Sequence, residues 1–242
     1  MFNFDLHIHS CLSPCGDLDN SPRNIGKCAR EAGLHGLMLS DHNSSRNAPA
    51  MAEICRREGL QMLYGMELAT SEEAHCLAIF DTLKQAQCFA DFVSSRLPDI
   101  VNNESVFGPQ LVVDADEYVI EMETMMLAAP TAISIPEAGE RIHAIGGLFV
   151  ACHIDRAYFS VISQLGAING DEGFDAVEVS RHSDLRKWRH KCHGLPVVRN
   201  SDAHYCGDIG AIYNQAPLTE FSVDALKYAL RHGQVKHKKN NA

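Results

Sequence analysis

The chain has 242 residues, 45% of them hydrophobic and 21% charged, which suits one folded domain with a substantial core. A formal net charge of −10 makes long nucleic acid an unfavoured partner, although a local basic groove stays compatible with it. Nine cysteines without a compact framework, together with an N-terminus that lacks a long apolar core, predict a reduced cytoplasmic protein. No apolar run approaches the roughly 18 residues of a membrane span, so we expect no membrane partner.

Short apolar segments alternate with amphipathic helices along the chain. The pattern predicts strands at 1–6, 34–40, 60–68, 75–80, 147–154, 174–180 and 195–201. One helix is expected to begin at the Ser21-Pro22 cap and to end at Gly33, and others are expected at 48–58 and 136–145. Near-continuous apolar strands separated by helices indicate an α/β fold with a parallel sheet covered on both faces.

Residues 99–131 interrupt this alternation of strands and helices. Within them, 111–122 can form a pair of short strands and 125–130 a piece of helix. Because the alternation resumes at once, we interpret 99–131 as an insertion or lid and 1–242 as a single domain. The basic segment 234–242 is expected to be a frayed, solvated tail.

Histidines and carboxylates fall at the ends of almost every predicted strand. They are His7, His9, Asp41, His42, Glu67, His75, His153, Asp202 and His204. Alternate residues of a strand share a face, so His7 and His9 project together with Asp5 behind them. Strand ends of parallel α/β folds converge, and so many unpaired polar groups would be costly without a cation. The mixture of imidazole and carboxylate favours zinc, manganese or iron.

Five segments together resemble the polymerase and histidinol phosphatase (PHP) domain phosphoesterases. They are DLHIHS at 5–10, SDHN at 40–43, GMEL at 65–68, GGLFVACHIDR at 146–156 and NSDAH at 200–204. The resemblance implies a distorted seven-stranded β/α barrel of TIM-like form, with the active site at the C-terminal strand ends. It also implies a cofactor of two to three divalent metal ions.

The resemblance further implies a ligand set for each ion. His7, His9 and Asp202 would hold one ion; Glu67 would bridge it to a second, held by His75 and His153; His42 and His204 would hold a third. The third set needs a ligand from the SPCGD loop at 13–17, where this chain departs from its relatives. We favour Asp17, which suits manganese or iron, and keep Cys15 as the alternative that suits zinc.

The implied reaction is hydrolysis of a phosphoester by a hydroxide that bridges the Glu67 metals. Asp202 or His204 is the nearest candidate to protonate the leaving group. Four side chains near the strand ends are candidates to bind the substrate phosphate: Arg156, Arg181, His182 and Arg199.

The net charge favours a small phosphomonoester, such as a nucleotide, a nucleoside bisphosphate or a histidinol-phosphate-like compound. Three other functions stay open. They are a non-hydrolytic PHP structural module, a metal-dependent amidohydrolase, and an exonuclease acting on the 5′ ends of short RNA. Nothing in the sequence predicts the oligomeric state.

Overall fold

The computed structural model describes residues 1–240, and its strands build one nine-stranded sheet and one separate hairpin. The large sheet has the order β11-β10-β1-β2-β3-β4-β7-β8-β9. Its strands are β1 (Phe2–Ile8), β2 (Gly36–Leu39), β3 (Gln61–Ala69), β4 (His75–Phe80), β7 (Leu148–Ala151), β8 (Ala176–Glu178), β9 (Val197–Val198), β10 (Ile212–Ala216) and β11 (Lys236–Lys239). All seven predicted strands are present, and β10 and β11 were not anticipated.

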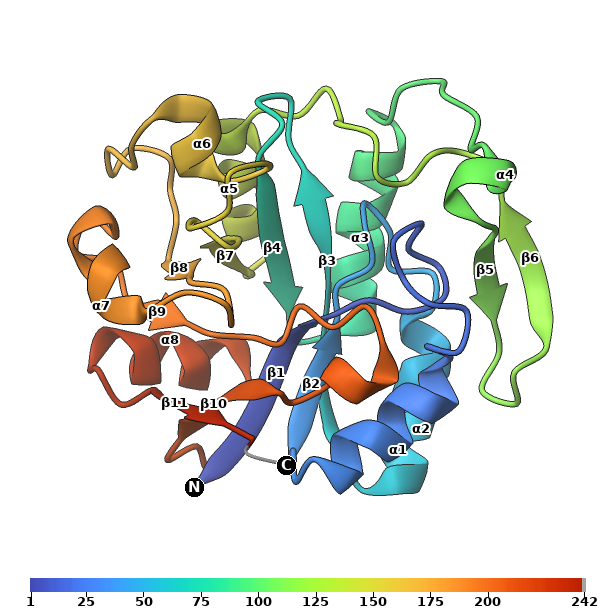
Figure 1. Ribbon diagram of the computed structural model, residues 1–242, viewed down its shortest axis with the longest axis horizontal. Coiled ribbons are helices and arrows are strands. Elements are labelled where there is room, and N and C mark those ends of the chain that lie inside the picture. Colours follow the sequence, from blue (N-terminus) through green and yellow to red (C-terminus); the bar gives the residue numbers. More distant parts are fainter. Residues whose placement is uncertain (241–242) are drawn as a thin grey trace.

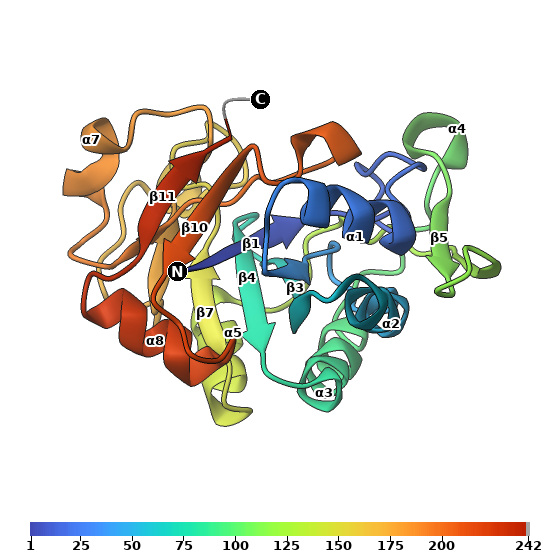
Figure 2. The same ribbon diagram turned by 90° about the horizontal axis from the view of Figure 1, so that it is seen from below.

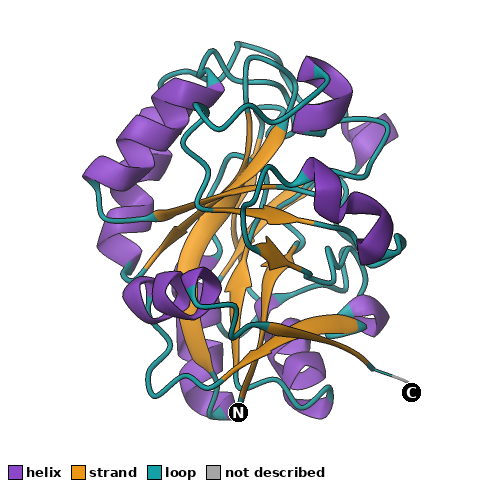
Figure 3. Cartoon of the chain, turned by 90° about the vertical axis from the view of Figure 1, so that its left-hand side faces the viewer, coloured by secondary structure: helices purple, strands orange, loops and turns teal. Residues whose placement is uncertain are grey.

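The sheet curves until the segment that follows its last strand, β9, meets β1. The segment after β9 returns to β1, where Ile8 and Ala203 form an isolated parallel bridge. The Ala203 N–H donates to the carbonyl of His7 (3.2 Å), and the His9 N–H donates to the carbonyl of Ala203 (2.9 Å). Figure 3 shows the strands in the middle with helices around them. The predicted α/β barrel is therefore confirmed, with two antiparallel strands added outside the seven.

Strand β4 runs against its neighbours, whereas we expected a parallel sheet. It pairs antiparallel with both β3 and β7, and His75 at its start lies opposite Ala69. Residues 70–74 join β3 directly to β4, and such a connection is too short for the crossover of roughly a dozen residues that parallel strands need. The reversal brings the start of β4 to the edge where β1 and β3 end. His75 therefore reaches the same site as histidines at strand ends.

The helices cover the outside of the barrel (Figures 1 and 2). They are α1 (Pro22–Glu31), α2 (Ala48–Glu58), α3 (Leu83–Ser94), α4 (Glu104–Phe107), α5 (Ile135–Ala144), α6 (Val161–Leu165), α7 (Leu185–Trp188) and α8 (Val223–Arg231), with 3-10 turns η1 (Arg189–Lys191) and η2 (Cys206–Asp208). The Ser21 side chain caps α1 by accepting the Asn24 N–H, and Gly59 ends α2 with φ +71°. The three predicted helices are confirmed. Among the described helices, none is long and apolar enough to cross a membrane.

Apolar side chains fill the barrel below the strand ends. Leu6, Met38, Leu77 and Val150 are buried there in one cluster, and Leu226 of α8 belongs to the same cluster. A second cluster lies between the sheet and the helices α3 and α5, and a third lies under α1 and α2. Since burial of apolar surface stabilises by about 25 cal/mol per Å², these layers hold the strand ends in fixed positions.

The segment 99–131 contains a two-stranded sheet of β5 (Gln110–Val113) and β6 (Val119–Glu123), as predicted. Figure 1 places this hairpin at the opposite side of the molecule from α8 and β11. The predicted helix at 125–130 is wrong. Its backbone bonds to side chains instead, because Asn43 donates to the carbonyls of Leu127 and Ala129 and the Leu127 N–H donates to Gln110.

The expectation of a frayed tail at 234–242 is also wrong for its described part. Residues Lys236–Lys239 form β11, which pairs antiparallel with β10, and 241–242 lie outside the described residues. His237 of β11 is half-buried and contacts the Asn214 side chain at 3.2 Å. Backbone pairing along an existing strand thus overrides the polar composition of the segment.

Substitution of Gly65 by alanine should lower the free energy of unfolding by about 1–3 kcal/mol. A Cβ at Gly65 would lie 2.0 Å from the carbonyl oxygen of Ala78 on β4, so β3 and β4 could no longer approach. Chemical denaturation measures the change. Gly207→Ala is the matched control, because a Cβ there meets nothing within 4 Å. Equal stability of the two variants would contradict the close approach.

The pairing of β11 with β10 partly buries His237, and this predicts that the free energy of unfolding depends on pH. Burial, together with the positive charges of Arg199 and Arg189, lowers the pKa of His237 to about 4. The unfolded chain takes up this proton near pH 6.5, so stability is lost as the pH falls from about 6.5 to about 4. The His237→Asn variant should lose on the order of 2 kcal/mol less than wild type over this range. Melts of both proteins, with exposed His232→Asn as control, measure it; parallel pH profiles for His237→Asn and wild type would refute it.

Candidate metal centre

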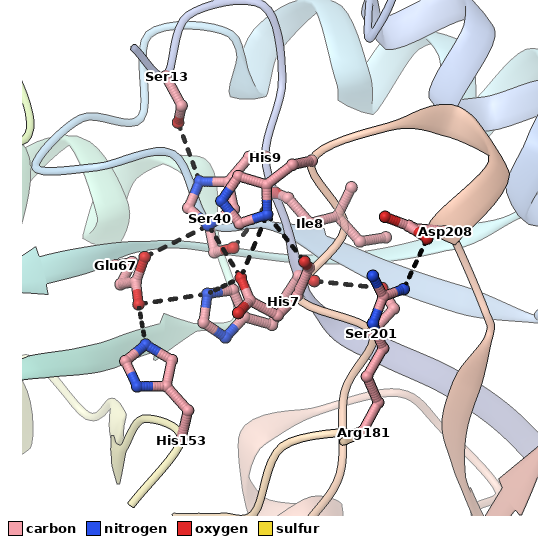
Figure 4. Close-up of polar contacts among 12 residues, drawn as sticks. His7, Ile8, His9, Ser13, Ser40, Glu67, His153, Arg181, Ser201 and Asp208 are labelled. Carbon is pink, nitrogen blue, oxygen red and sulfur yellow. Dashed lines mark hydrogen bonds and ion pairs between the residues drawn. The ribbon is translucent and has the colours of Figure 1, made fainter. Parts of the chain in front are cut away.

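The carboxylate of Glu67 lies at the centre of a buried histidine cluster. Glu67 is 1% exposed near the end of β3. Its Oε1 lies 3.3 Å from His7 Nε2, 3.1 Å from His75 Nδ1 and 3.2 Å from His153 Nε2, and its Oε2 lies 3.3 Å from both His9 Nε2 and His42 Nδ1. Figure 4 shows His7, His9 and His153 turned toward this carboxylate. Five histidines distant in sequence thus meet at one glutamate.

A second carboxylate, Asp202, faces the same cluster from the segment after β9. Its Oδ1 lies 3.4 Å from His7 Nε2 and 3.5 Å from His9 Nε2. His204, two residues on, packs its ring on that of His9 with centroids 4.6 Å apart. Asp202 adopts φ +50°, a left-handed conformation uncommon outside glycine. The backbone is therefore bent at the residue that turns its carboxylate toward the histidines.

The ring nitrogens of this cluster fit a bound cation. The buried His7 Nε2, His9 Nε2 and His42 Nδ1 have no hydrogen-bond partner among the described residues. His7 Nδ1 lies 3.0 Å from Glu178 Oε2 and donates its proton there, so its Nε2 turns a lone pair toward the oxygens of Glu67 and Asp202. Facing lone pairs at such distances require a positive charge between them. A divalent ion is the group that this donor set suits.

The candidate ligand atoms gather in compact groups. His7, His9 and Asp202 form one such group, and His42, Glu67 and His75 form another, each with ligand atoms within 4.8 Å of one another. Imidazole and carboxylate donors together fit zinc, manganese or iron, as the sequence predicted. His153, from the segment after β7, contacts Glu67 from the other side with a backbone φ of +26°.

Two sets of buried hydrogen bonds orient the rings of His7 and His9. Glu178 accepts from His7 Nδ1 and from the amide of Asn200 at 2.6 Å. The Ser13 hydroxyl lies 3.0 Å from His9 Nδ1 and donates to Asp41 at 2.8 Å. Such partners fix the ring orientation of a metal-binding histidine and raise its basicity.

Sequence analysis missed Glu178, although the signal was present in the chain. It is a glutamate between two valines in the predicted strand 174–180, and it is fully buried. A charged side chain in a buried strand needs a partner, and here the partners are His7 and Asn200.

The electrostatics of the cluster favour neutral imidazoles on one side and positive charge on the other. Burial lowers the pKa of His42 well below its usual value and that of His204 to about 4. Burial also lowers the pKa of His9, but the nearby carboxylates of Asp202 and Glu67 outweigh it and raise this pKa to about 9. The two carboxylates thus attract a cation to the ring of His9.

The loop after β1 brings Cys15 rather than Asp17 to the cluster. Cys15, His9 and His42 form a group with ligand atoms within 4.8 Å of one another. Asp17 joins no such group among the described residues. Its carboxylate accepts the Asp19 N–H at 2.8 Å, and its own N–H donates to the carbonyl of His204. Our preference for Asp17 thus finds no geometric support, and the alternative ligand Cys15 does.

The four predicted phosphate-binding residues have different surroundings. Arg156 forms an ion pair with Asp202 and is 40% exposed, so it borders the cluster. Arg181 pairs with Asp208 at 2.8 Å (Figure 4). Its Nε lies 3.2 Å from the ring of His182.

Arg199 is turned away from the site. It is 7% exposed and donates to the backbone carbonyls of residues 179, 180 and 183. Its expected contact with phosphate is therefore wrong, because its guanidinium is already bonded to the protein.

Comparison with known proteins identifies the family. The PHP domain model matches residues 5–182, and a PHP-associated model matches residues 186–235. The chain therefore belongs to the PHP family.

Individual relatives are more distant. Protein YqxK of Bacillus subtilis is 27% identical over 190 residues, which cover 71% of this chain and 42% of YqxK. Protein MJ1587 of Methanocaldococcus jannaschii is 32% identical over 76 residues, which cover 28% of this chain and 44% of MJ1587. The chain thus spans less than half the length of these curated relatives.

Solved structures share the fold. Endonuclease Q from Pyrococcus furiosus superposes with a TM-score of 0.71 at 19% identity, covering 98% of this chain and 57% of the endonuclease. A candidate metal-dependent phosphoesterase from Bifidobacterium adolescentis gives a TM-score of 0.60 at 22% identity, covering 94% of this chain and 95% of the other. At these identities the likeness establishes the barrel and leaves the reaction to the site itself.

Replacement of Glu178 by glutamine should weaken binding of zinc or manganese about tenfold, because His7 then loses its charged partner. Glutamine keeps the size of the side chain, so the melting temperature of the metal-free protein should change little. Titration against a chelating dye measures the affinity, with exposed Glu140→Gln as the control. An affinity for metal equal to that of the control would show that Glu178 does not support the site.

Proposed function

We propose that this protein is a metal-dependent phosphoesterase that hydrolyses a small phosphomonoester. One observation carries the proposal: Glu67 lies within 3.3 Å of ring nitrogens from five histidines, and Asp202 faces two of them. Two to three divalent ions of manganese, iron or zinc are the proposed cofactor. Bound divalent ions lower the pKa of water and neutralise charge on phosphoryl oxygens, which are the two needs of phosphoester hydrolysis.

The proposed ligands follow the groups seen in the structure. His7, His9 and Asp202 hold one ion, and Glu67 links it to a second near His75 and His153. His42 would hold a third, with Cys15 rather than Asp17 as the loop ligand, in the group that both form with His9. His204, whose ring stacks on that of His9, is proposed to complete this set. Asp202 and His204 remain the proposed proton donors to the leaving group, and His204, with 25% of its side chain exposed, is the more accessible of the two.

Arg156 is the proposed clamp for the substrate phosphate, since its guanidinium already borders the carboxylate of Asp202. Arg181 and His182 lie farther along the same side and are proposed to contact the rest of the substrate. The rim also carries aromatic rings. Phe159 stacks on His75 with centroids 4.9 Å apart, and Tyr158 is 75% exposed. These rings favour a substrate with a planar group, such as a nucleotide.

Residues 99–131 are proposed to act as a lid on this site. Asn43, next to the candidate ligand His42, holds the segment through the carbonyls of Leu127 and Ala129. We also propose that the chain is one domain. Phe221 and Leu226, from the part matched by the PHP-associated model, pack in the same cluster as Phe4 and Leu6 of β1.

A nucleic-acid phosphodiester is the second candidate substrate. Endonuclease Q has been solved with a 27-mer duplex substrate carrying an abasic lesion at the active site. The exposed Tyr158 and Tyr205 beside the cluster could stack on unpaired bases. The formal charge of −10 favours the smaller substrate, because it opposes approach of a long polyanion.

The test is a panel of substrates with protein loaded with manganese, iron or zinc. We expect release of phosphate from nucleotide monophosphates or bisphosphates, and no hydrolysis of amides. The His9→Ala variant should lose measurable turnover while its melting temperature in the absence of metal stays near that of wild type. Elemental analysis of the purified protein should find close to three equivalents of metal.

Several outcomes would contradict the proposal. Failure to cleave p-nitrophenyl phosphate, nucleotides and bisphosphates with every metal would point to a structural module. Cleavage of amides alone would indicate an amidohydrolase. Cleavage of oligonucleotides alone would move the assignment to the second candidate. Turnover retained by His9→Ala would show that the active site lies elsewhere.

A further inference from the structure

A cavity of about 590 Å³ lies at the other end of the barrel from the metal centre. Residues 194–197, before and at the start of β9, line one side of it, whereas Asp202 and His204 follow the end of β9. Its other walls come from η1, the end of α8 and β11. In Figure 1, β9, α8 and β11 lie together at the lower left. The cavity is therefore separate from the candidate active site.

Two arginines on this cavity have no partner within the described residues. Arg189 of η1 and Arg231 of α8 both line it and are exposed. Every other arginine of the chain has an ion pair with a carboxylate, a bond to a backbone carbonyl, or, for Arg141, the ring of Phe92. In a chain with a net charge of −10, two unpaired guanidinium groups at one cavity stand out from the rest.

The lining of the cavity contains no carboxylate among the described residues. Its polar members besides the arginines are His237 and Cys192, and the remainder is apolar or glycine. The positive charge of Arg189 contributes to the lowered pKa of His237, which shows that the two groups lie in one electrostatic field. An anion in the cavity would meet positive charge with no competing carboxylate in the lining.

Simpler roles explain part of the positive charge around the cavity, but not why Arg189 and Arg231 both line it. Arg231 lies in the last turn of α8, where a cation favours the helix dipole. The lysines of β11 occupy an edge strand, where they oppose pairing with other chains. Neither role accounts for Arg189, or for the presence of both arginines on one cavity whose apolar floor includes Leu195, Val197 and Leu230.

We propose that this cavity binds a phosphate group through Arg189 and Arg231, carried by an organic molecule of about mononucleotide size. Guanidinium groups bind phosphate through paired hydrogen bonds, and the volume falls within the roughly 300–1,000 Å³ of ligand sites. The apolar floor would pack against the organic part of the ligand. This site is independent of the proposed hydrolysis. Its phosphate can come from a free nucleotide or from a nucleic-acid backbone.

Calorimetric titration of the full chain in EDTA tests the proposal with inorganic phosphate, AMP and adenosine as probes. AMP should bind more tightly than phosphate, and adenosine should bind at least tenfold more weakly than AMP. The double variant Arg189→Ala, Arg231→Ala should bind AMP at least tenfold more weakly than wild type. The control Arg56→Ala, an exposed arginine of α2 outside both sites, should bind AMP within twofold of wild type.

Neither arginine has an ion pair to lose, and Arg231 adds only a favourable charge at the end of α8, so the double variant should melt close to wild type. This separates loss of binding from loss of folding. A single-stranded oligonucleotide that displaces AMP would identify a nucleic-acid backbone as the source, and failure to displace it would identify a free nucleotide. Absence of binding by every probe would overturn the proposal. So would AMP binding that survives in the double variant or is lost to the same extent in Arg56→Ala.

Discussion

The buried carboxylate of Glu67 is the constraint on which the rest of the structure depends. At 1% exposure it cannot be hydrated, so its charge must be balanced by groups of the protein or by bound cations. The five imidazoles around it come from β1, from the segments after β2 and β7, and from the start of β4. No flat sheet could bring these elements within reach of one side chain. The curvature of the barrel and the reversal of β4 are therefore requirements of the site.

The rings of His7 and His9 are also oriented by hydrogen bonds at the nitrogens that face away from Glu67. Glu178 fixes His7, and the Ser13 and Asp41 pair fixes His9, so each ring presents its other nitrogen to the carboxylates. Two residues of the cluster, His153 and Asp202, also adopt positive φ angles. Such conformations cost about 1–3 kcal/mol each and persist where the surroundings enforce them. The apolar layers beneath the cluster supply that enforcement and make the geometry rigid.

The two ends of the barrel differ in charge. The carboxylates Glu67 and Asp202 define the end that suits metal ions, and Arg189 and Arg231 define a cavity at the other end. A formal net charge of −10 averages over these regions and describes neither of them. The net charge therefore disfavours the approach of a long polyanion, but it does not determine which ligand one face of the molecule binds. The same chain can carry a cation site and an anion site because its strands separate them.

The sequence alone determined the seven strands of the barrel, three of its helices and the polar residues that meet at the strand ends. Apolar periodicity and helix caps are local, and they survive in the structure at Ser21 and at Gly59. The family resemblance rested on short segments in which ligands lie one or two residues apart. Those features need no knowledge of distant partners.

Tertiary structure decided what depends on partners far along the chain. The pairing of β11 with β10 and the support of His7 by Glu178 both follow from contacts between segments far apart in the chain. The same is true of the choice between Cys15 and Asp17 and of the inward turn of Arg199. A loop side chain is directed by the backbone bonds that anchor the loop, and a strand side chain by its register with neighbouring strands. Sequence spacing fixes neither of these, and so the residue types of the site could be predicted while part of its geometry could not.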